Sequence, residues 1–441
     1  MTHPPNLTRD AALAARTAGA ALAHLSSESR SSLLRDLAGA LEDPQARAAI
    51  LAANTADLEP AQAAEARGEL KPALVGRLGL DAKKLDGMAD GLRQLAAMPE
   101  LVGQALLRRE LDDGLILEKV SCPLGLVGVV FESRPEALGQ IVGLTLKSGN
   151  AVILKGGREA LHSNRALTAV IHEVLARHGL DARAVLLLEE RSQVEALLAL
   201  DGIVEMIVAR GSSEFVQHVR QNTKIPVLGH AAGVCHLYLH AAADPAMAAR
   251  LAVDAKCTYP SACNALETLL WDPGAGAALD AAVQALEQAG VELRGCPATR
   301  ARHPMKGMKE MKAATEADWG FEFSGLVLAL RQVPDLDGAL AHIAAHGSRH
   351  TEAIVTGDRA AAERFLAEVD AAGVFHNAST RFADGYRYGL GAEVGVSTDK
   401  LHARGPVGVE GLITYRWLLR GDGHRTADYG PGGRRFRHRD L

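Results

Sequence analysis

Cysteine is scarce in this sequence, and its spacing excludes several classes of protein. Of 441 residues only five are cysteines, which are Cys122, Cys235, Cys257, Cys263 and Cys296. They form neither a paired framework nor a Cys-x-x-Cys motif, so we expect neither disulfides nor a metal site built on cysteine pairs. An odd number of thiols, and the lack of an apolar leader after Met1, predict reduced cysteines and a cytoplasmic protein.

Strong charge and long apolar runs are lacking as well. The net charge is −5, and no apolar run approaches the length of a bilayer span. We therefore expect neither a nucleic acid nor a membrane as a partner. No Gly-x-Gly-x-x-Gly fingerprint occurs at the first predicted strand, which argues against an ordinary dinucleotide-binding fold. The length and an apolar content of 48% are typical of a soluble protein with two or three domains.

Strands and helices alternate from residue 124 onwards. Strands are predicted at 126–131, 151–155, 184–188 and 205–209, and helices at 135–147, 160–178 and 193–200. After Pro226 a second unit contains predicted strands at 234–239, 266–271, 326–330, 353–356 and 374–376. This alternation is typical of parallel sheets covered by helices, which bind nucleotides at the carboxyl ends of their strands. The fold class is therefore α/β.

The two ends of the chain have other patterns. Leucines recur at helical spacing in the first hundred residues, and the run 54–57 is predicted to interrupt that helical region. Asp112-Asp113-Gly114 indicates the turn of a hairpin at 111–119. An apolar stretch at 412–419 is followed by a polar, basic tail, which we expect to be flexible.

Cys263 lies in an unusual setting. Pro260, Ser261 and Ala262 before it are poor strand formers and predict a short loop, and an apolar segment begins after it. A thiol on such a loop is placed to attack a carbonyl, and a backbone N–H or the amide of Asn264 is placed to hold the resulting oxyanion. The alternative is that Cys263 is a small buried hydrophobic residue, as most free cysteines are.

Several stretches are similar, in order and spacing, to a single family. They are 130–137 (Val-Phe-Glu-Ser-Arg-Pro-Glu-Ala), 154–158 (Leu-Lys-Gly-Gly-Arg), Gly229-His230, 256–268 around Cys263, 377–382 (Asn-Ala-Ser-Thr-Arg-Phe) and 401–408 (Leu-His-Ala-Arg-Gly-Pro-Val-Gly). Together they closely resemble the glutamate-5-semialdehyde dehydrogenase (gamma-glutamyl phosphate reductase) family of the aldehyde dehydrogenase superfamily. The resemblance runs from about residue 10 to residue 421, and the tail beyond it is an addition to the family pattern.

The resemblance implies a fold and a reaction. The fold would be aldehyde dehydrogenase-like, with two Rossmann-like α/β domains and a β-ribbon for oligomerisation. Its parts would be an NADP-binding domain (1–109 and 123–229), a catalytic domain (230–404), the ribbon (110–122 and 405–421) and the tail (422–441). The enzyme would reduce L-glutamyl 5-phosphate with NADPH to glutamate 5-semialdehyde and phosphate in proline biosynthesis. The resemblance also implies a homo-oligomer, glutamate 5-kinase as an upstream partner, and no metal.

In the implied mechanism the Cys263 thiolate attacks the acyl phosphate and forms a thioester, which then accepts a hydride. Lys256 or the start of a helix would favour the thiolate. Hydrolytic relatives carry a general-base glutamate where this chain reads Val-Leu-Gly-His-Ala-Ala-Gly at 227–233. The lack of a carboxylate there suits an enzyme that protects its thioester from water. His230 either lines the site or orients its neighbours.

The resemblance places the cofactor at Lys155 and Arg158. NAD-using relatives have a glutamate where Arg158 stands, and a guanidinium would instead pair with the 2′-phosphate of NADP. The alternative is a surface arginine paired with Glu159. Further cofactor contacts are predicted at the pyrophosphate and the nicotinamide ribose, and the candidates are Arg210, Gly211, Ser212 and Glu322. A solvated role is the alternative for Glu322.

Substrate recognition needs an anion site for the phosphate and another site for the alpha-amino acid end. The candidate substrate-binding residues are Arg134, Ser348, Ser379, Thr380 and Arg381. The oxyanion donor is Asn264, a backbone amide or Ser133. Loop capping by short polar side chains is the alternative for these residues.

Two rival functions are weighed against this one. An acylating, CoA-dependent or hydrolytic enzyme of the same fold is the first, and the missing general base argues against hydrolysis. A catalytically silent scaffold that binds nucleotide is the second, and the presence of Cys263, Lys155 and Arg381 together argues against it.

Overall fold

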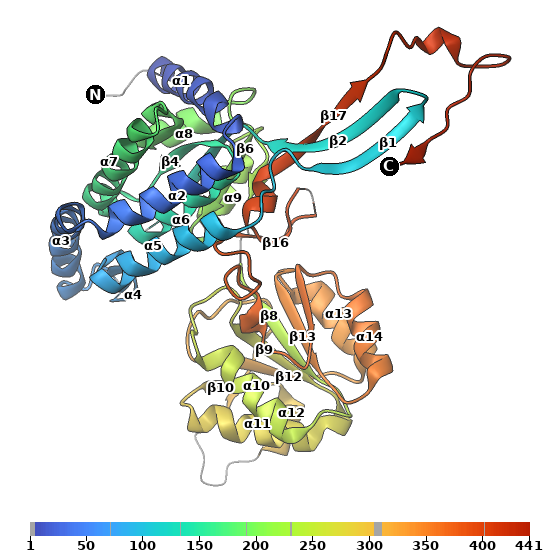
Figure 1. Ribbon diagram of the computed structural model, residues 1–441. Coiled ribbons are helices and arrows are strands. Elements are labelled where there is room, and N and C mark those ends of the chain that lie inside the picture. Colours follow the sequence, from blue (N-terminus) through green and yellow to red (C-terminus); the bar gives the residue numbers. More distant parts are fainter. Residues whose placement is uncertain are drawn as a thin grey trace.

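The protein has three structural parts, two α/β domains and a ribbon that extends from one of them (Figure 1). The computed structural model describes residues 5–70, 72–132, 134–190, 192–229, 232–303, 311–400 and 402–441. No helix in these ranges has the length and apolar character needed to span a membrane.

Five helices precede the first sheet. They are α1 (Pro5–Ala23), α2 (Ser27–Glu42), α3 (Pro44–Ala66), α4 (Pro72–Leu78) and α5 (Ala82–Ala97). Four of them pack into the core of the first domain, and α4 packs into a small cluster beside α3. The predicted interruption at 54–57 is wrong, because α3 continues through it. Asn54 donates to the carbonyl of Leu78, and Asp57 accepts from the backbone and hydroxyl of Ser163. Both polar side chains are buried within the helical segment without cost to it, because each has a hydrogen-bond partner.

The first domain is built on a parallel sheet in the order β5-β4-β3-β6-β7. Its elements are β3 (Leu126–Phe131), α6 (Pro135–Lys147), β4 (Ala151–Lys155), α7 (Leu161–Arg177), β5 (Val185–Leu188), α8 (Ser192–Leu198), β6 (Met206–Arg210), α9 (Ser213–Gln221) and β7 (Val227–Leu228). Every residue of β3 and β4 is buried, as expected for central parallel strands. The strands and helices for which bounds were predicted from residue 124 to 209 are confirmed to within two residues, whereas no bounds were predicted for α9 and β7.

A late segment of the chain returns to this first domain. Ala392, Val394, Val407, Val409 and Leu412 belong to its hydrophobic core, and the strands β15 (Val396–Ser397) and β16 (Gly405–Pro406) pair between them. The catalytic domain was predicted to extend to residue 404, so its boundary differs in the structure. The reason is that these apolar side chains are buried against the first sheet.

The second domain has a seven-stranded parallel sheet in the order β11-β10-β12-β9-β8-β13-β14. Its strands are β8 (Cys235–Leu239), β9 (Leu266–Trp271), β10 (Glu292–Gly295), β11 (Lys312–Ala313), β12 (Val327–Gln332), β13 (Thr351–Val355) and β14 (Gly373–His376), and its helices are α10 (Pro245–Cys257), α11 (Gly276–Gln288), α12 (Pro297–Arg302), α13 (Leu336–His346) and α14 (Arg359–Glu368). Successive side chains of β8 face opposite cores, with Leu237 towards α10 and α11 and Tyr238 towards α13 and α14. Helices therefore cover both faces, as the alternating pattern predicts.

The ribbon is an antiparallel sheet in the order β17-β2-β1-β18. Its strands are β1 (Ala105–Asp112), β2 (Leu115–Pro123), β17 (Ile413–Arg420) and β18 (Arg439–Asp440). The predicted turn is confirmed, with Gly114 at a φ of 72° that favours glycine. The hairpin was predicted to begin at residue 111 and the ribbon at residue 110, but pairing with β2 begins at Ala105.

The tail was predicted to be flexible, but it is folded back along β1 (Figure 1). Tyr429 donates a hydrogen bond to the carboxylate of Asp112, and Arg434 and Arg437 form ion pairs with the same carboxylate. The backbone of β18 pairs with β1. Three basic residues of the tail, Arg434, Arg437 and Arg439, are therefore held by acidic residues of the hairpin, which local sequence does not reveal.

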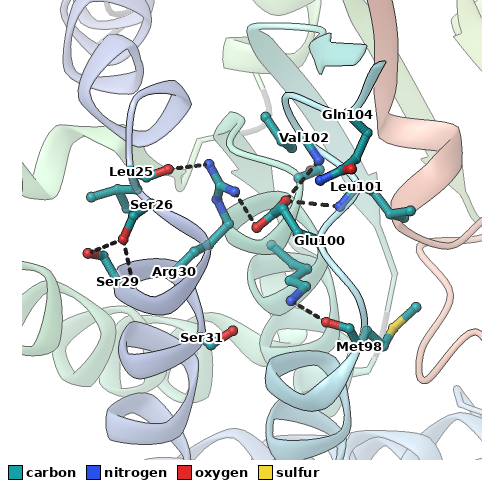
Figure 2. A network of polar contacts seen from close by, with 12 residues as sticks. Leu25, Ser26, Ser29, Arg30, Ser31, Met98, Glu100, Leu101, Val102 and Gln104 are labelled. Atoms are coloured by element: carbon teal, nitrogen blue, oxygen red, sulfur yellow. Dashed lines mark hydrogen bonds and ion pairs between the residues drawn. The ribbon is translucent and has the colours of Figure 1, made fainter. Parts of the chain in front are cut away.

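A buried polar network fastens the base of the ribbon to the helices (Figure 2). Arg30 of α2 forms an ion pair with Glu100 at 2.8 Å and donates to the carbonyl of Leu25. Glu100 in turn accepts hydrogen bonds from the backbone of Leu101 and Val102, just before β1. One carboxylate therefore joins α2 to the segment that enters the ribbon.

Candidate active site

Cys263 lies in a turn between α10 and β9 and is half-buried. Its backbone packs against Gly233, where an added Cβ would lie 2.0 Å from the carbonyl oxygen of Cys263. Cys235 donates from its sulfur to the same carbonyl at 3.5 Å. The predicted loop is confirmed, and the backbone of the turn is held by Gly233 and Cys235.

Neither predicted activator of the thiolate is supported by the structure. The ammonium of Lys256 forms a fully buried ion pair with Glu267 at 2.6 Å. Burial raises the pKa of Glu267 to about 7 and lowers the pKa of Lys256. Because the ammonium of Lys256 is bound to Glu267, it is not the partner of a Cys263 thiolate. The element that follows Cys263 is the strand β9, so no helix begins at the sulfur.

Asn264 connects the nucleophile turn to a second loop. Its side chain is buried, and its Nδ2 donates to the carbonyl of Ala383 at 2.9 Å. This bond uses one of the two amide hydrogens. The role of Asn264 as oxyanion donor stays a prediction, and the structure adds a positioning role.

Glu322 and Ser348 hold the segment that packs behind Cys263. Glu322 accepts a hydrogen bond from the backbone of Gly233 at 2.9 Å, so it is not the solvated residue of the alternative interpretation. Ser348 accepts from the backbone N–H of Val234 at 2.9 Å and donates to its carbonyl at 3.1 Å. The predicted contact of Ser348 with substrate stays a prediction, and the structure adds that its hydroxyl binds both backbone groups of Val234.

The loop around Ser379, Thr380 and Arg381 lies beside the nucleophile turn. Ser379 caps its own short helical turn by accepting from the backbone of Arg381. The Oγ1 of Thr380 is buried and has no hydrogen-bond partner among the described residues. Arg381 donates from Nε to Thr258 at 3.3 Å, and its guanidinium lies 5.8 Å from the ring centre of Tyr259. The structure thus brings a hydroxyl and a guanidinium close to Cys263.

Arg381 also interacts electrostatically with the nucleophile. Burial lowers the pKa of its guanidinium, and the neighbouring Arg387 lowers it further. The negative charge of a Cys263 thiolate acts in the opposite direction. This arrangement is suited to an anionic group bound at the sulfur.

A cavity of about 770 Å³ opens at the carboxyl ends of β3 and β4. Lys155 and Arg158 both line it, as predicted for a cofactor site. Lys155 is buried and donates to the carbonyl of Gly156 at 2.6 Å, and burial lowers its pKa. Arg158 is exposed. A cavity at this edge of a parallel sheet is the usual nucleotide position.

The carboxylate of Glu132 contacts the residues just before α9. Ser212 caps α9 by accepting from the backbone of Phe215, and its own N–H donates to Glu132 at 3.3 Å. Burial raises the pKa of Glu132. Gly211 packs directly on Glu132, since an added Cβ would lie 2.8 Å from its carboxyl carbon. The predicted pyrophosphate contacts at Gly211 and Ser212 stay predictions.

Arg210 lies elsewhere than predicted. It ends β6 and lines a separate cavity of about 340 Å³ together with Arg134, whereas the sequence placed it with Gly211 at the cofactor. Ser133 and His230, both predicted for the site, lie outside the described residues.

Sequence reasoning missed two residues. Gly233 is in contact with the nucleophile turn. The only sequence signal for it was its place in the stretch 227–233, where hydrolytic relatives carry a general base. Glu393 lines the cavity that contains Arg210, more than 180 residues away along the chain, and no local pattern marks it.

Comparison with known proteins gives a consistent result. No family model matches the chain. A gamma-glutamyl phosphate reductase of Synechococcus sp. (strain JA-3-3Ab) is 55% identical over 429 residues, which are 97% of this chain and 93% of that protein. One of Cyanothece sp. (strain PCC 7425 / ATCC 29141) is 51% identical over 445 residues, covering 99% of both chains.

Solved structures agree with these relatives. The crystal structure of a gamma-glutamyl phosphate reductase from Thermotoga maritima has a TM-score of 0.89 and 35% identity, over 95% of this chain and 99% of that one. An acetylating aldehyde dehydrogenase from Geobacillus thermoglucosidasius has a TM-score of 0.65 at 15% identity, over 96% and 98% of the two chains. The second likeness concerns the fold alone.

Proposed function

Because the chain belongs to the gamma-glutamyl phosphate reductase family, we propose that it reduces L-glutamyl 5-phosphate with NADPH through a thioester on Cys263. The products are L-glutamate 5-semialdehyde and phosphate, in the second step of proline biosynthesis from glutamate. The observation that carries the proposal is the placement of Cys263 in a turn beside Thr380 and Arg381.

The chemistry uses the sulfur as a temporary acyl carrier. The thiolate of Cys263 attacks the δ carbon of the acyl phosphate, the C–O bond to phosphate breaks, and a thioester remains. Bound NADPH supplies the hydride that reduces this thioester. The thiohemiacetal then collapses, which releases the aldehyde and restores the thiolate. Arg381 and Thr380 are suited to hold the phosphate group, since a guanidinium and a hydroxyl both donate to phosphate oxygens.

The larger cavity supports NADPH as the cofactor. Lys155 and Arg158 supply two cationic groups at its wall, and a 2′-phosphate needs such partners. We expect Arg158→Glu to lower kcat/KM for NADP about 10- to 100-fold, as for the loss of a charged hydrogen bond, with a much smaller effect on NAD. Equal losses with both cofactors would show that Arg158 pairs with Glu159 instead.

The decisive experiment is the reverse reaction with glutamate semialdehyde, NADP and phosphate, followed by the absorbance of NADPH. We expect turnover to require phosphate and to be lost in Cys263→Ala. Cys257→Ala is the matched control, because Cys257 lies six residues earlier on α10 and its thiol pKa is raised by burial. Turnover without phosphate would indicate hydrolytic chemistry, and a requirement for CoA would indicate an acylating enzyme.

Iodoacetamide labelling tests the nucleophile independently of turnover. Cys263 is expected to be the fastest-labelled thiol, with substrate giving protection. Full activity after complete labelling of Cys263 would overturn the thioester mechanism. It would mean that the reduction does not depend on this sulfur.

The ribbon supports a proposed homo-oligomer. β17 forms one edge of the ribbon sheet and exposes Tyr415, Trp417 and Leu419. An open edge with large apolar side chains favours association with another chain. Sedimentation at micromolar concentration is expected to show a dimer or larger species, and a monomer alone would contradict this. Glutamate 5-kinase as the upstream partner and a cytoplasmic location stay predictions.

A further inference from the structure

The reaction chemistry does not use the ion pair between Lys256 and Glu267. Both side chains are completely buried, and the ammonium Nζ lies 2.6 Å from Oε2 of the carboxylate. Lys256 belongs to α10, which precedes the nucleophile turn, and Glu267 belongs to β9, which follows it. Moving two charges out of water is costly, and apolar residues of similar volume often give an equally stable protein. The pair is therefore expected to serve a purpose other than stability.

Glu267 has a second partner outside its own strand. Its other oxygen, Oε1, accepts a hydrogen bond from the backbone N–H of Ser324 at 3.3 Å. Because Lys256 binds Oε2, the two oxygens of one carboxylate connect the ion pair to the loop 322–324. This loop also carries Glu322, so the buried carboxylate contacts a segment of the candidate active site.

The backbone of Ser324 has a conformation that few residues with a side chain adopt. Its φ is 53°, which lies in the left-handed region. Such a conformation persists only where the surrounding contacts fix it, and residues of this kind cluster at functional sites. The bond from the N–H of Ser324 to the buried carboxylate of Glu267 is a contact that fixes it.

The loop in turn contacts the segment that packs on the nucleophile turn. Two residues before Ser324, Oε2 of Glu322 accepts a hydrogen bond from the N–H of Gly233 at 2.9 Å. Gly233 packs on the backbone of Cys263 so closely that an added Cβ would overlap it. A continuous series of contacts therefore runs from Glu267 through the loop to the nucleophile.

We propose that Glu267 is a positioning residue for the reaction at Cys263. Its carboxylate, balanced by Lys256, fixes Ser324 in the left-handed conformation. This conformation places Glu322 where it holds Gly233 against the nucleophile turn. The inference rests on the proposed function, because it is the reaction that requires the sulfur at a fixed place. Glu267 acts through the loop and not by contact with the reacting atoms.

The test compares two uncharged double variants that differ in the acceptor for the N–H of Ser324. Both contain Lys256→Met, which removes the ammonium group. In the acceptor variant, Glu267→Gln keeps an oxygen that can accept from Ser324. In the apolar variant, Glu267→Met fills a similar volume without an acceptor. If the ion pair were merely structural, the more stable of the two variants would also be the more active.

We expect the apolar variant to unfold at the same or a higher urea concentration than the acceptor variant, because it buries no unpaired amide group. In the reverse reaction its kcat should nevertheless be at least about tenfold lower than that of the unaltered protein, whereas the acceptor variant should stay within about threefold. Amide exchange over residues 232–235 should be about tenfold faster in the apolar variant, because Glu322 no longer holds the N–H of Gly233.

Ser324 provides an independent test, because it is exposed and its replacement does not disturb the core. Ser324→Pro removes the N–H and cannot adopt a positive φ, whereas Ser324→Ala, the matched control, keeps the N–H. We expect Ser324→Pro to reproduce the lower kcat and the faster exchange of the apolar variant. Ser324→Ala should leave both quantities within about twofold of the unaltered protein.

Equal kcat values in the acceptor and apolar variants would overturn the inference and leave the reductase function intact. Unchanged amide exchange over residues 232–235 in the apolar variant and in Ser324→Pro would overturn it as well. If the unaltered protein does not turn over glutamate semialdehyde with phosphate, the proposed function fails, and the exchange measurement still decides whether the loop holds Gly233. If circular dichroism shows that a double variant is unfolded, the comparison of Ser324→Pro with Ser324→Ala decides.

Discussion

Replacing Gly233 by alanine would place a methyl group against the nucleophile turn. The added Cβ would lie 2.0 Å from the carbonyl oxygen of Cys263, 2.5 Å from its Cα and 2.6 Å from its carbonyl carbon. All three atoms are backbone, so no side-chain rotation relieves the overlap. Ordinary contact begins at 3.4 Å, so the two segments must separate by about 1 Å, and a displacement of that size at a reacting group can cost about 100-fold in rate.

The assay is the reverse reaction, with kcat/KM and the rate of iodoacetamide labelling measured on the same preparation. We expect kcat/KM to fall about 100-fold in Gly233→Ala, because the sulfur moves with its backbone. Gly39→Ala is the matched control: Gly39 lies within α2 with no atom within 4 Å of an added Cβ. It should retain full activity and gain about 0.5–1 kcal/mol in unfolding free energy, since alanine favours helix.

A fall of less than about threefold in Gly233→Ala would refute this reasoning, because it would mean that about 1 Å of displacement at the sulfur is tolerated. A loss of activity accompanied by loss of the folded state would show that Gly233 supports the domain rather than the nucleophile. Equilibrium unfolding of the variant separates these two results.

Three further predictions concern stability. Arg30→Ala leaves Glu100, whose side chain is 12% exposed, without its ion pair and should cost about 1.5–3 kcal/mol in urea unfolding, as for the loss of a charged hydrogen bond, whereas a loss below about 1 kcal/mol would show that water replaces the guanidinium. Burial and the neighbouring His236 lower the pKa of His342 from an ordinary value of 6.5 to about 2, so its contribution to stability is present above pH 6.5 and lost as the pH falls. Between pH 6.5 and 5 this loss should be about 2 kcal/mol, and His342→Phe should remove it; an unchanged pH dependence in the variant would contradict the assignment. Deleting residues 422–441 should raise amide hydrogen exchange in β1 at least about tenfold, and unchanged exchange would show that the tail does not protect that strand.

Much of the fold is predictable from the sequence where apolar runs are continuous. β3, β4, β9 and α6 have the predicted bounds, because each is rich in apolar residues and buried over most or all of its length. β10 was missed because Glu292 and Arg294 alternate with its two buried residues and give it little apolar character. The interruption predicted at 54–57 failed because the partners of Asn54 and Asp57 lie far along the chain.

The candidate site shows the same division. Cys263 and its loop follow from local residues, and the placement of Lys155 and Arg158 follows from the strand before them. Arg210 lines the smaller cavity because of the face of β6 on which its side chain lies. Local sequence does not determine that face. The bond between the hydroxyl of Ser348 and the backbone of Val234, 114 residues away, was not predicted. Long-range pairing of this kind is visible only in the folded chain.

The ribbon joins segments that are made at very different times. Arg109 of β1 forms an ion pair with Asp440, 331 residues later, and β17 pairs with β2 across a similar span. The first parallel sheet and the whole second domain lie between these partners, so the ends meet only after both have been synthesised and have become compact. Closing so long a loop is slow. A complete ribbon therefore forms only after the rest of the molecule has folded. Oligomerisation through the edges of the ribbon would thus be limited to chains that have folded completely.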